Sequence, residues 1–314
     1  MHSRKVSFML FPFSEYWWLY GVFSGLVVLL LALDLGIFHR KAHAIGLREA
    51  ATWTVVFTTL ALAFNFGLWQ YARATLHDDA HANRIALEFL TGYVIEQALS
   101  VDNLFVFVLI FGYFGIARHR QHRILFYGIL GAIVFRGMFI ALGSALLQYQ
   151  WVLIAFGIAL CLTGAKMFFG ADQKVNPEKS VAVRTVRWIW PGASTFALCL
   201  ATIEVSDIVF AIDSVPAIFA ITKDPFIVFT SNVFAILGLR SMYFLLANVV
   251  GKFHLLRYGL GIVLVFIGLK MAWLNDLWDG HFPIGISLGV IATVIAGSIL
   301  LSLVFSAPAR ETDR

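Results

Sequence analysis

The sequence predicts an all-α fold, a polytopic bundle of about nine transmembrane helices, and three observations support it. Of the 314 residues, 60% are hydrophobic and only 13% are charged, whereas soluble domains are about a quarter charged. The mean hydropathy is +0.85. Apolar stretches of about 20 residues, the length that crosses a bilayer, recur along the whole chain. We therefore expect a single membrane domain over residues 1–314.

Short polar loops separate the expected spans, and tryptophan and tyrosine residues lie near many span ends, as at a membrane interface. The charged segment 171–192 is expected to be a cytoplasmic linker loop between two halves. Within it, Arg184–Trp190 has the pattern of a short amphipathic stretch on the membrane surface. The spans are placed at residues 16–38, 49–70, 86–114, 123–147, 150–170, 193–222, 225–248, 255–275 and 282–305.

Lysine and arginine residues favour one side of the expected membrane. They gather in the loops after spans one, three, five and seven and at the C-terminus. The positive-inside rule then places the N-terminus outside and the C-terminus in the cytoplasm. These residues form no patch with interleaved aromatics, so the lipid bilayer is the expected partner and nucleic acid is not. Cys161 and Cys199 have neither disulfide nor zinc spacing.

The two halves of the chain resemble each other, and charged residues recur at matching places inside the spans. Residues 86–170, the third to fifth spans, therefore repeat as residues 193–275. Because three is an odd number, the second copy is inverted, an arrangement that many secondary transporters use to build a midplane site. The matched segments are Ala98–Asn103 with Val209–Ser214, Glu96 with Asp207, Phe135–Phe139 with Leu239–Tyr243, and Gly164–Met167 with Gly268–Met271.

Acidic residues inside the spans are the strongest functional signal. A charge at bilayer depth costs about 2.5–3.5 kcal/mol, so six unpartnered acids would cost about 15–20 kcal/mol. Such a cost requires ion pairs, protons or a bound cation. The acids are Asp34, Glu96, Asp102, Glu204, Asp207 and Asp213, and the basic residues within spans are Arg136, Arg240, Lys166 and Lys270.

A structural interpretation of these charges is ion pairing for helix packing. Arg136 and Arg240 lie near mid-span and can pair with Glu96 and Glu204. The two lysines lie at span ends, where their side chains can reach the interface. These pairs do not neutralise the aspartates as well, so the functional interpretation is that the aspartates bind a cation.

Helix geometry predicts interruptions at the acidic sites. Glu96 and Asp102 lie about 240° apart around an ideal helix, and Glu204 and Asp213 are about half a turn out of phase. Pro216 removes a helical hydrogen-bond donor. Broken helices that line a cavity would free carbonyl oxygens as ligands. We therefore expect broken helices at these positions.

The candidate ligands are hard oxygen donors, without accompanying histidines or cysteine pairs. Such ligands suit Mg²⁺, Ca²⁺ and Mn²⁺. On the outer side, the loop at His77–His81 could hold a metal weakly, or it is a solvated loop. The expected metal site comprises Asp102, Asp213, Glu96, Asp207, Glu204, Asn103 and Ser214, with Asp34 beside the path.

These motifs resemble the TerC family, and most closely its Alx-type branch. The match extends over nearly the whole chain, with one departure at Gln97, where a lysine is usual. The resemblance implies an inner-membrane protein of the LysE-like transporter grouping that exports manganese, and it assigns the acidic motif positions to the residues above. The motifs are Glu96 with Ser100–Asn103, Glu204–Asp207, Ala211–Pro216, Asp224–Val228, Thr230–Asn232, Ala235–Arg240 and Met242–Leu246.

The expected function is export of a divalent cation, with Mn²⁺ first, by alternating access and in exchange for protons. Asp102 and Asp213 would bind the cation at the repeat interface. The alternative is a membrane protein assembly or partner factor without transport activity, and a selective channel is a further option. An enzyme is not expected, because the Gly-x-Gly-Asp signature of an intramembrane aspartyl protease is absent. No resident cofactor is expected.

Overall fold

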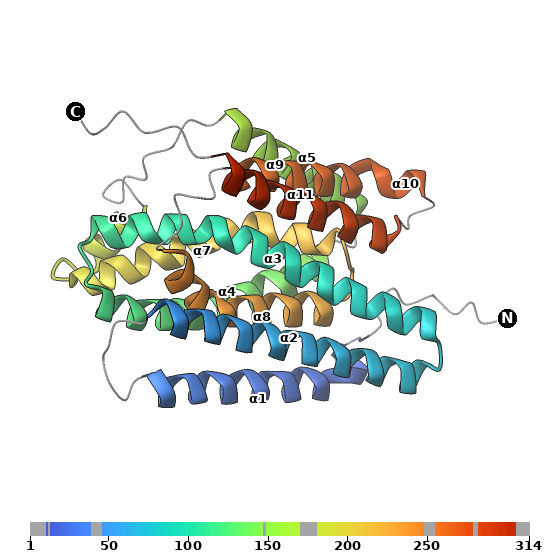
Figure 1. Ribbon diagram of the computed structural model, residues 1–314, viewed down its shortest axis with the longest axis horizontal. Helices are drawn as coiled ribbons and strands as arrows, with labels where there is room; N and C mark the ends of the chain where they lie inside the picture. The colour runs from blue at the N-terminus through green and yellow to red at the C-terminus, as the bar shows by residue number, and fades with distance from the viewer. Residues whose placement is uncertain are drawn as a thin grey trace.

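The computed structural model describes residues 11, 13–38, 46–146, 149–169, 181–247, 255–278 and 282–305. Within these ranges every regular element is a helix, and Figure 1 shows the long helices running along the longest axis of the molecule. Nine of the helices in the described ranges are long and apolar enough to cross a membrane. The predicted polytopic helical bundle is confirmed.

The spanning helices follow the expected spans closely, with two short helices, α6 (Val181–Ile189) and α10 (Asn275–Leu277), between them. The spanning helices are α1 (Phe13–Phe38), α2 (Leu47–Leu76), α3 (Asp79–Tyr113), α4 (Arg118–Leu146), α5 (Gln150–Phe169), α7 (Thr195–Phe219), α8 (Pro225–Leu246), α9 (Leu256–Leu269) continued by a π-helical turn at Lys270–Leu274, and α11 (Ile284–Val304).

Capping side chains set several helix starts. Asp78 precedes α3 and accepts hydrogen bonds from the N–H groups of Ala80 and His81. Asp224 precedes α8 and accepts hydrogen bonds from N–H groups of the first turn. Pro225 follows it at the first helical position, where its missing N–H group costs no hydrogen bond. These caps satisfy N–H groups that a helix start leaves without partners.

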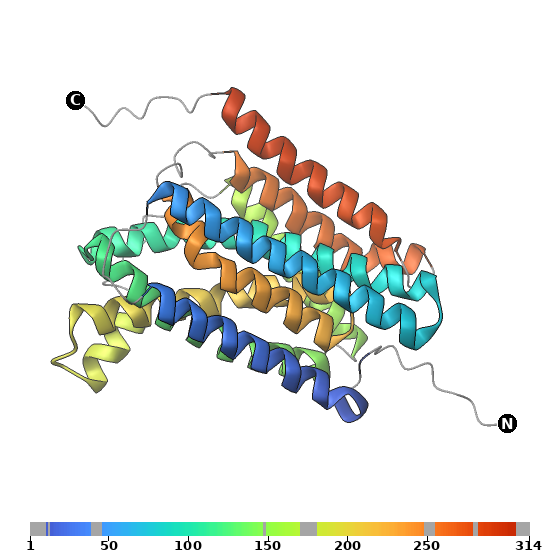
Figure 2. The ribbon, with the colours of Figure 1, turned by 60° about the horizontal axis from the view of Figure 1, so that its bottom comes forward.

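Helix α8 lies at the centre of the bundle. Its spanning window is 89% buried, against 17% for those of α1, α2 and α11. Figure 2 shows α8, in orange, running between α1 and α2, and it also packs against α3 and α4. Its buried polar side chains Thr230, Ser231, Asn232 and Arg240 therefore lie inside the protein and away from lipid.

Close contacts join α5 and α9, two helices that the predicted repeat matches to each other. A Cβ atom at Gly157 would lie 2.8 Å from the carbonyl oxygen of Gly268, and one at Gly164 would lie 2.6 Å from that of Gly261. The register that aligns Gly164 with Gly268 also aligns Gly157 with Gly261. Under the predicted repeat, the Gly157–Gly268 contact therefore corresponds to the Gly164–Gly261 contact. Helix α3 also contacts α8, and α4 contacts α7. Because the predicted repeat matches α3 with α7 and α4 with α8, these two contacts correspond to each other. An inverted repeat with a two-fold axis between its copies would predict this pattern.

The structure corrects the expectation of broken helices. Both α3 and α7 are continuous, and Pro216 lies inside α7. The proline is close to the end of its helix, which stops at Phe219, and its carbonyl accepts a hydrogen bond from the N–H of Ala220. Membrane helices tolerate proline where local adjustments satisfy the freed groups. The interruption predicted from Pro216 therefore does not form.

Candidate functional site

A buried arginine organises the centre of the bundle. Arg136 on α4 is 0% exposed. Its Nη1 donates to Glu96 Oε1 on α3 in a short ion pair, and also to Asn232 Oδ1 on α8 at 3.1 Å and Ser214 Oγ on α7 at 3.4 Å. Its Nη2 and Nε donate to the two carboxylate oxygens of Asp207 on α7, at 3.1 and 3.3 Å. One guanidinium thus joins four helices.

Further hydrogen bonds hold the Glu96 carboxylate. Asn232 Nδ2 donates to its Oε2 at 3.1 Å, and the Ser100 hydroxyl donates to its Oε1 at 3.5 Å. Asn103 is also buried on α3, and its Nδ2 has no hydrogen-bond partner among the described residues. Because Glu96 itself is 0% exposed, its charge depends on these partners and on Arg136.

Glu204 lies beside this cluster but outside its ion pairs. It precedes Asp207 by about one turn of α7, and its Oε2 is buried without a hydrogen-bond partner in the described part of the chain. Its carboxyl group packs directly on Gly131 of α4, where an added Cβ atom would overlap Oε2. The region therefore contains three carboxyl groups and one guanidinium.

Asp213 occupies a different position. It is partly buried on α7, and the hydroxyl of Thr163 on α5 donates to its Oδ1 at 3.2 Å. Lys166, one turn further along α5, is exposed and acts on it electrostatically. The structure does not bring Asp213 into the Arg136 cluster, whereas the sequence placed it at the centre of a metal site.

The side chains of two predicted acids, Asp34 and Asp102, lie outside the described part of the structure. Asp34 belongs to α1 and Asp102 to α3. Among the described residues, no three histidine, cysteine, aspartate or glutamate side chains gather as a metal-binding group. The described carboxyl groups therefore surround an arginine and do not form a preassembled metal cage.

The remaining basic residues of the spans differ from each other. Arg240 is buried on α8. Lys270 begins the π-helical turn, is 2% exposed, and has its Nζ 5.8 Å from the ring centroid of Phe282. The predicted ion pair between Arg136 and Glu96 is present. The second carboxylate that pairs with Arg136 belongs to Asp207, and Glu204 forms no ion pair with Arg136.

Sequence reasoning did not single out Glu88, although it lies inside the predicted span 86–114. Glu88 is 3% exposed and accepts hydrogen bonds from Thr222 Oγ1 at 2.6 Å and Arg84 Nε at 2.8 Å. Eight residues separate it from Glu96, about 2.2 turns, so the two side chains point about 80° apart around α3. Its acidic side chain within an apolar span was the available signal. Asn232 was visible only as part of a motif.

The comparisons with known proteins agree with this architecture. The integral membrane protein TerC family matches residues 81–310. The uncharacterized membrane protein STKORF319 of Myxococcus xanthus is 43% identical, with 94% of this chain and 95% of the relative covered. The "Putative membrane-bound redox modulator Alx" of Photorhabdus laumondii is 44% identical, covering 91% and 94%. The protein of the same name in Escherichia coli K12 is 43% identical, covering 90% and 94%.

No solved structure matches the chain. The family match extends over most of the residues and includes all the helices that contribute to the Arg136 cluster. The chain is therefore a multi-pass integral membrane protein and belongs to the TerC family.

Proposed function

We propose that this protein exports a divalent metal cation, with Mn²⁺ as the first candidate, from the cytoplasm by alternating access of its two repeats. The charge of the loops supports an N-terminus outside and a C-terminus in the cytoplasm of the inner membrane. The resemblance to the TerC family supports manganese, because oxygen ligands alone do not distinguish it from Ca²⁺ or Mg²⁺.

The observation that carries the proposal is the excess of acid around Arg136. Glu96 and Asp207 share its guanidinium, and Glu204 lies beside them with a buried oxygen that no described residue contacts by a hydrogen bond. Acidic side chains at bilayer depth face a protein interior or a path, and they mark ion sites and proton relays. An incoming cation or proton would supply the missing positive charge.

The chain's own residues suggest how the site would work. While no cargo is bound, Arg136 compensates the charges of Glu96 and Asp207. The Glu204 carboxyl group is the one that a cation can approach without breaking an existing pair. Since the described acids do not converge on one point, binding requires a movement that brings further oxygens to Glu204. The contacts between α4 and α7 are where the two repeats would rearrange.

Exchange for protons would relieve the electrical cost of export. Moving a divalent cation out of a cell against 100 mV costs about 4.6 kcal/mol, at about 2.3 kcal/mol per charge. The entry of two protons would cancel this term. Carboxyl groups that release a metal can take up protons, so the buried acids can serve both ions in turn.

The test uses purified protein in lipid vesicles with a trapped fluorescent indicator. Vesicles with the protein should take up Mn²⁺ faster than empty vesicles, and an imposed proton gradient should drive uptake beyond equilibrium. Mg²⁺ and Ca²⁺ added separately give the selectivity. Purified, folded protein that moves no divalent cation would favour the alternative, an assembly or partner factor. Flux that never runs against the gradient would favour a channel.

The name of the Alx relatives suggests a second role, in redox modulation. The described structure gives this role little support through thiol chemistry. Cys199 is buried on α7, Cys161 is partly buried on α5, and both are free. Their sequence spacing is far from that of a paired redox motif. The ion-transport proposal therefore rests on the acidic cluster. A redox assay would test the second role and would not test ion transport.

A further inference from the structure

The two carboxylates that share the Arg136 guanidinium depend on it to different degrees. The predicted repeat matches Glu96 with Asp207. Glu96 also accepts hydrogen bonds from Asn232 and Ser100, whereas in the described part of the chain Asp207 accepts hydrogen bonds from Arg136 alone. Loss of the arginine would therefore leave Glu96 with two donors and leave Asp207, which is 5% exposed, with none.

Asn232 holds the arginine on the side of α3 and α8. Its Oδ1 accepts a hydrogen bond from Arg136 Nη1, and its Nδ2 donates to Glu96 Oε2, both at 3.1 Å. With the ion pair between Arg136 and Glu96, these contacts form a closed triangle of side chains from three helices. On the side of α7, Asp207 has no such third partner, and Ser214 contacts only Nη1, at 3.4 Å. The bond to Asp207 is therefore the one that can be exchanged with the smallest loss.

A second carboxyl group lies within reach of Asp207. Glu204 precedes it by three residues on α7, and residues at this spacing have their Cβ atoms about 5–6 Å apart. The Glu204 Oε2 atom is buried and has no hydrogen-bond partner among the described residues. Carboxylate oxygens are the ligands that hard divalent cations prefer. The two side chains can therefore bind one such cation once the arginine has left Asp207.

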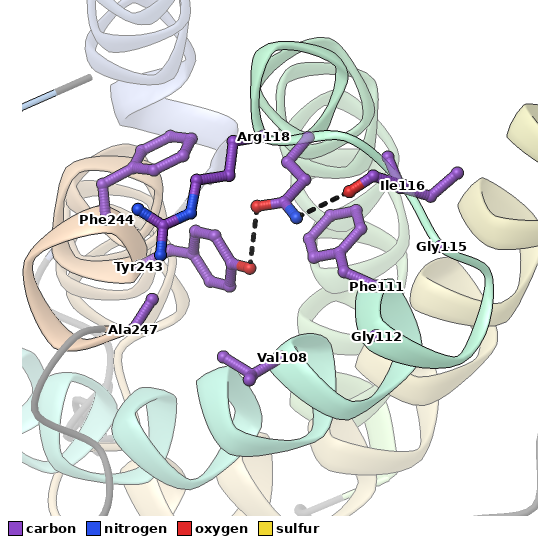
Figure 3. A pocket seen from close by; sticks show the side chains of 10 residues that line it. Val108, Phe111, Gly112, Gly115, Ile116, Arg118, Tyr243, Phe244 and Ala247 are labelled. Carbon is purple, nitrogen blue, oxygen red and sulfur yellow. Dashed lines mark hydrogen bonds between the residues drawn. The ribbon is translucent and has the colours of Figure 1, made fainter. Parts of the chain in front are cut away.

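The packing favours replacement of the arginine over addition of a cation beside it. Arg136 is fully buried, and the Glu204 carboxyl group packs on Gly131. Figure 3 shows a cavity of about 280 Å³ where α3 and α8 end and α4 begins, with Tyr243 in its wall. No residue of the Arg136 cluster lines that cavity, so it gives no room for a cation at the cluster. The room must come from movement of the arginine.

We propose that Arg136 is an exchangeable counter-charge, and that a divalent cation takes its place on Asp207 with Glu204 as the second carboxylate. The guanidinium stays on Glu96 and Asn232. This inference rests on the proposed function, because it uses the same cation and the same acids. Asp207 then faces a positive charge in both states. Since α4 belongs to the first predicted repeat and α7 to the second, the exchange also releases a contact between the repeats and so links binding to their rearrangement.

The test measures Mn²⁺ binding to purified protein in neutral detergent, from the rise in unfolding temperature with Mn²⁺ concentration at constant ionic strength. Arg136→Gln removes the competing charge. Its apparent affinity for Mn²⁺ should be about tenfold or more higher than that of the wild type, the gain expected when a charge-assisted hydrogen bond no longer opposes binding. Arg73→Gln, which removes an exposed arginine paired with Asp79, should keep the wild-type affinity.

A second variant keeps the positive charge, because Arg136→Gln is expected to be less stable than the wild type. Lysine has one ammonium group and cannot form the fork of two N–H groups that holds Asp207. Arg136→Lys should therefore also bind Mn²⁺ more tightly than the wild type, by about threefold or more. Adding Asp207→Asn to Arg136→Lys should abolish this gain, because the exchange takes place on Asp207. Arg136→Gln that folds only when Mn²⁺ is present would support the inference.

Three outcomes would overturn the inference. Unchanged or weaker Mn²⁺ affinity in both Arg136 variants would mean that the arginine does not compete with the cation. A gain that survives Asp207→Asn would place the exchange on another carboxylate. Equal stabilisation by sodium chloride at matched ionic strength would reduce the effect to screening.

Mn²⁺ flux through the wild type in vesicles separates this inference from the proposed function. Wild-type flux without a gain in affinity in the variants would refute the exchange and leave transport standing. A gain in affinity without wild-type flux would refute transport and leave the exchange standing.

Discussion

Replacing Arg136 by glutamine tests the energetic role of the buried cluster. The change keeps much of the side-chain volume but removes the charge that compensates both Glu96 and Asp207. Arg136 is 0% exposed, Glu96 is 0% exposed and Asp207 is 5% exposed, so water cannot replace the lost partner. Removing one member of a buried ion pair typically costs about 3–5 kcal/mol. We expect a loss of unfolding free energy in that range.

Denaturant unfolding of purified protein in detergent measures the effect, and the chain offers a matched control. Arg73 pairs with Asp79 through its Nε at 2.7 Å, but the two side chains are 50% and 68% exposed. Water and salt screen such pairs, which contribute about 0–1 kcal/mol. Arg73→Gln should therefore change stability by less than about 1 kcal/mol.

A combined variant separates charge from packing. If uncompensated carboxylates cause the loss, then adding Glu96→Gln and Asp207→Asn to Arg136→Gln should recover much of the stability, because no buried charge remains. Arg136→Gln that is no less stable than Arg73→Gln would refute the reasoning. So would a triple variant that is less stable than Arg136→Gln alone.

Three further predictions concern glycines and a helix cap. Gly131→Ala should displace the Glu204 carboxyl group packed on it and reduce Mn²⁺ flux in vesicles about tenfold or more, with thermal stability near that of wild type. Gly128→Ala on the same helix, whose Cβ would be 3.4 Å from its nearest neighbour, should leave flux unchanged, and equal losses would contradict the assignment. Gly157→Ala should destabilise the protein by about 1–3 kcal/mol in thermal unfolding, since its Cβ meets backbone at 2.8 Å, and a gain in stability would refute the close α5–α9 contact. The hydrogen bonds from His81 hold the pKa of Asp78 below its usual 3.8, so its contribution to the start of α3 is present above about pH 4 and is lost as pH falls through the lowered pKa. A carboxyl NMR titration should give a midpoint below 3.8 in the wild type, and a midpoint at or above that value would contradict the cap.

Much of the fold could be predicted from sequence because the bilayer imposes it. A helix needs about 20 apolar residues to cross the hydrocarbon core. Apolar stretches of that length predicted the positions of the spanning helices among the described residues. The helix ends were harder to predict, because α2 and α3 extend beyond their apolar segments. Helix α2 ends at Leu76, before His77 in the left-handed conformation, and α3 begins at Asp79, after the capping residue Asp78. These local signals do not depend on hydropathy.

The candidate site was predictable in its residue types but not in its pairing. Glu204 and Asp207 lie about one turn apart on α7, so either can face a neighbouring helix, and only the packing of α4 against α7 brings Asp207 to Arg136. Asp213 turns instead to Thr163, a residue with no sequence signal. The rotation of each helix decides such contacts, and rotation depends on small residues such as Gly131.

The central claim is that a partly buried acid beside Arg136 meets a cation, and Mn²⁺ flux through Glu204→Gln tests it most directly. The variant keeps the size of the side chain, removes its negative charge and replaces one carboxylate oxygen by an amide NH₂ group. Purified Glu204→Gln and the surface control Asp79→Asn would be compared with wild type in vesicles, at equal amounts of folded protein. The account predicts at least about a tenfold loss of flux for Glu204→Gln and none for Asp79→Asn. Wild-type flux through Glu204→Gln would contradict it.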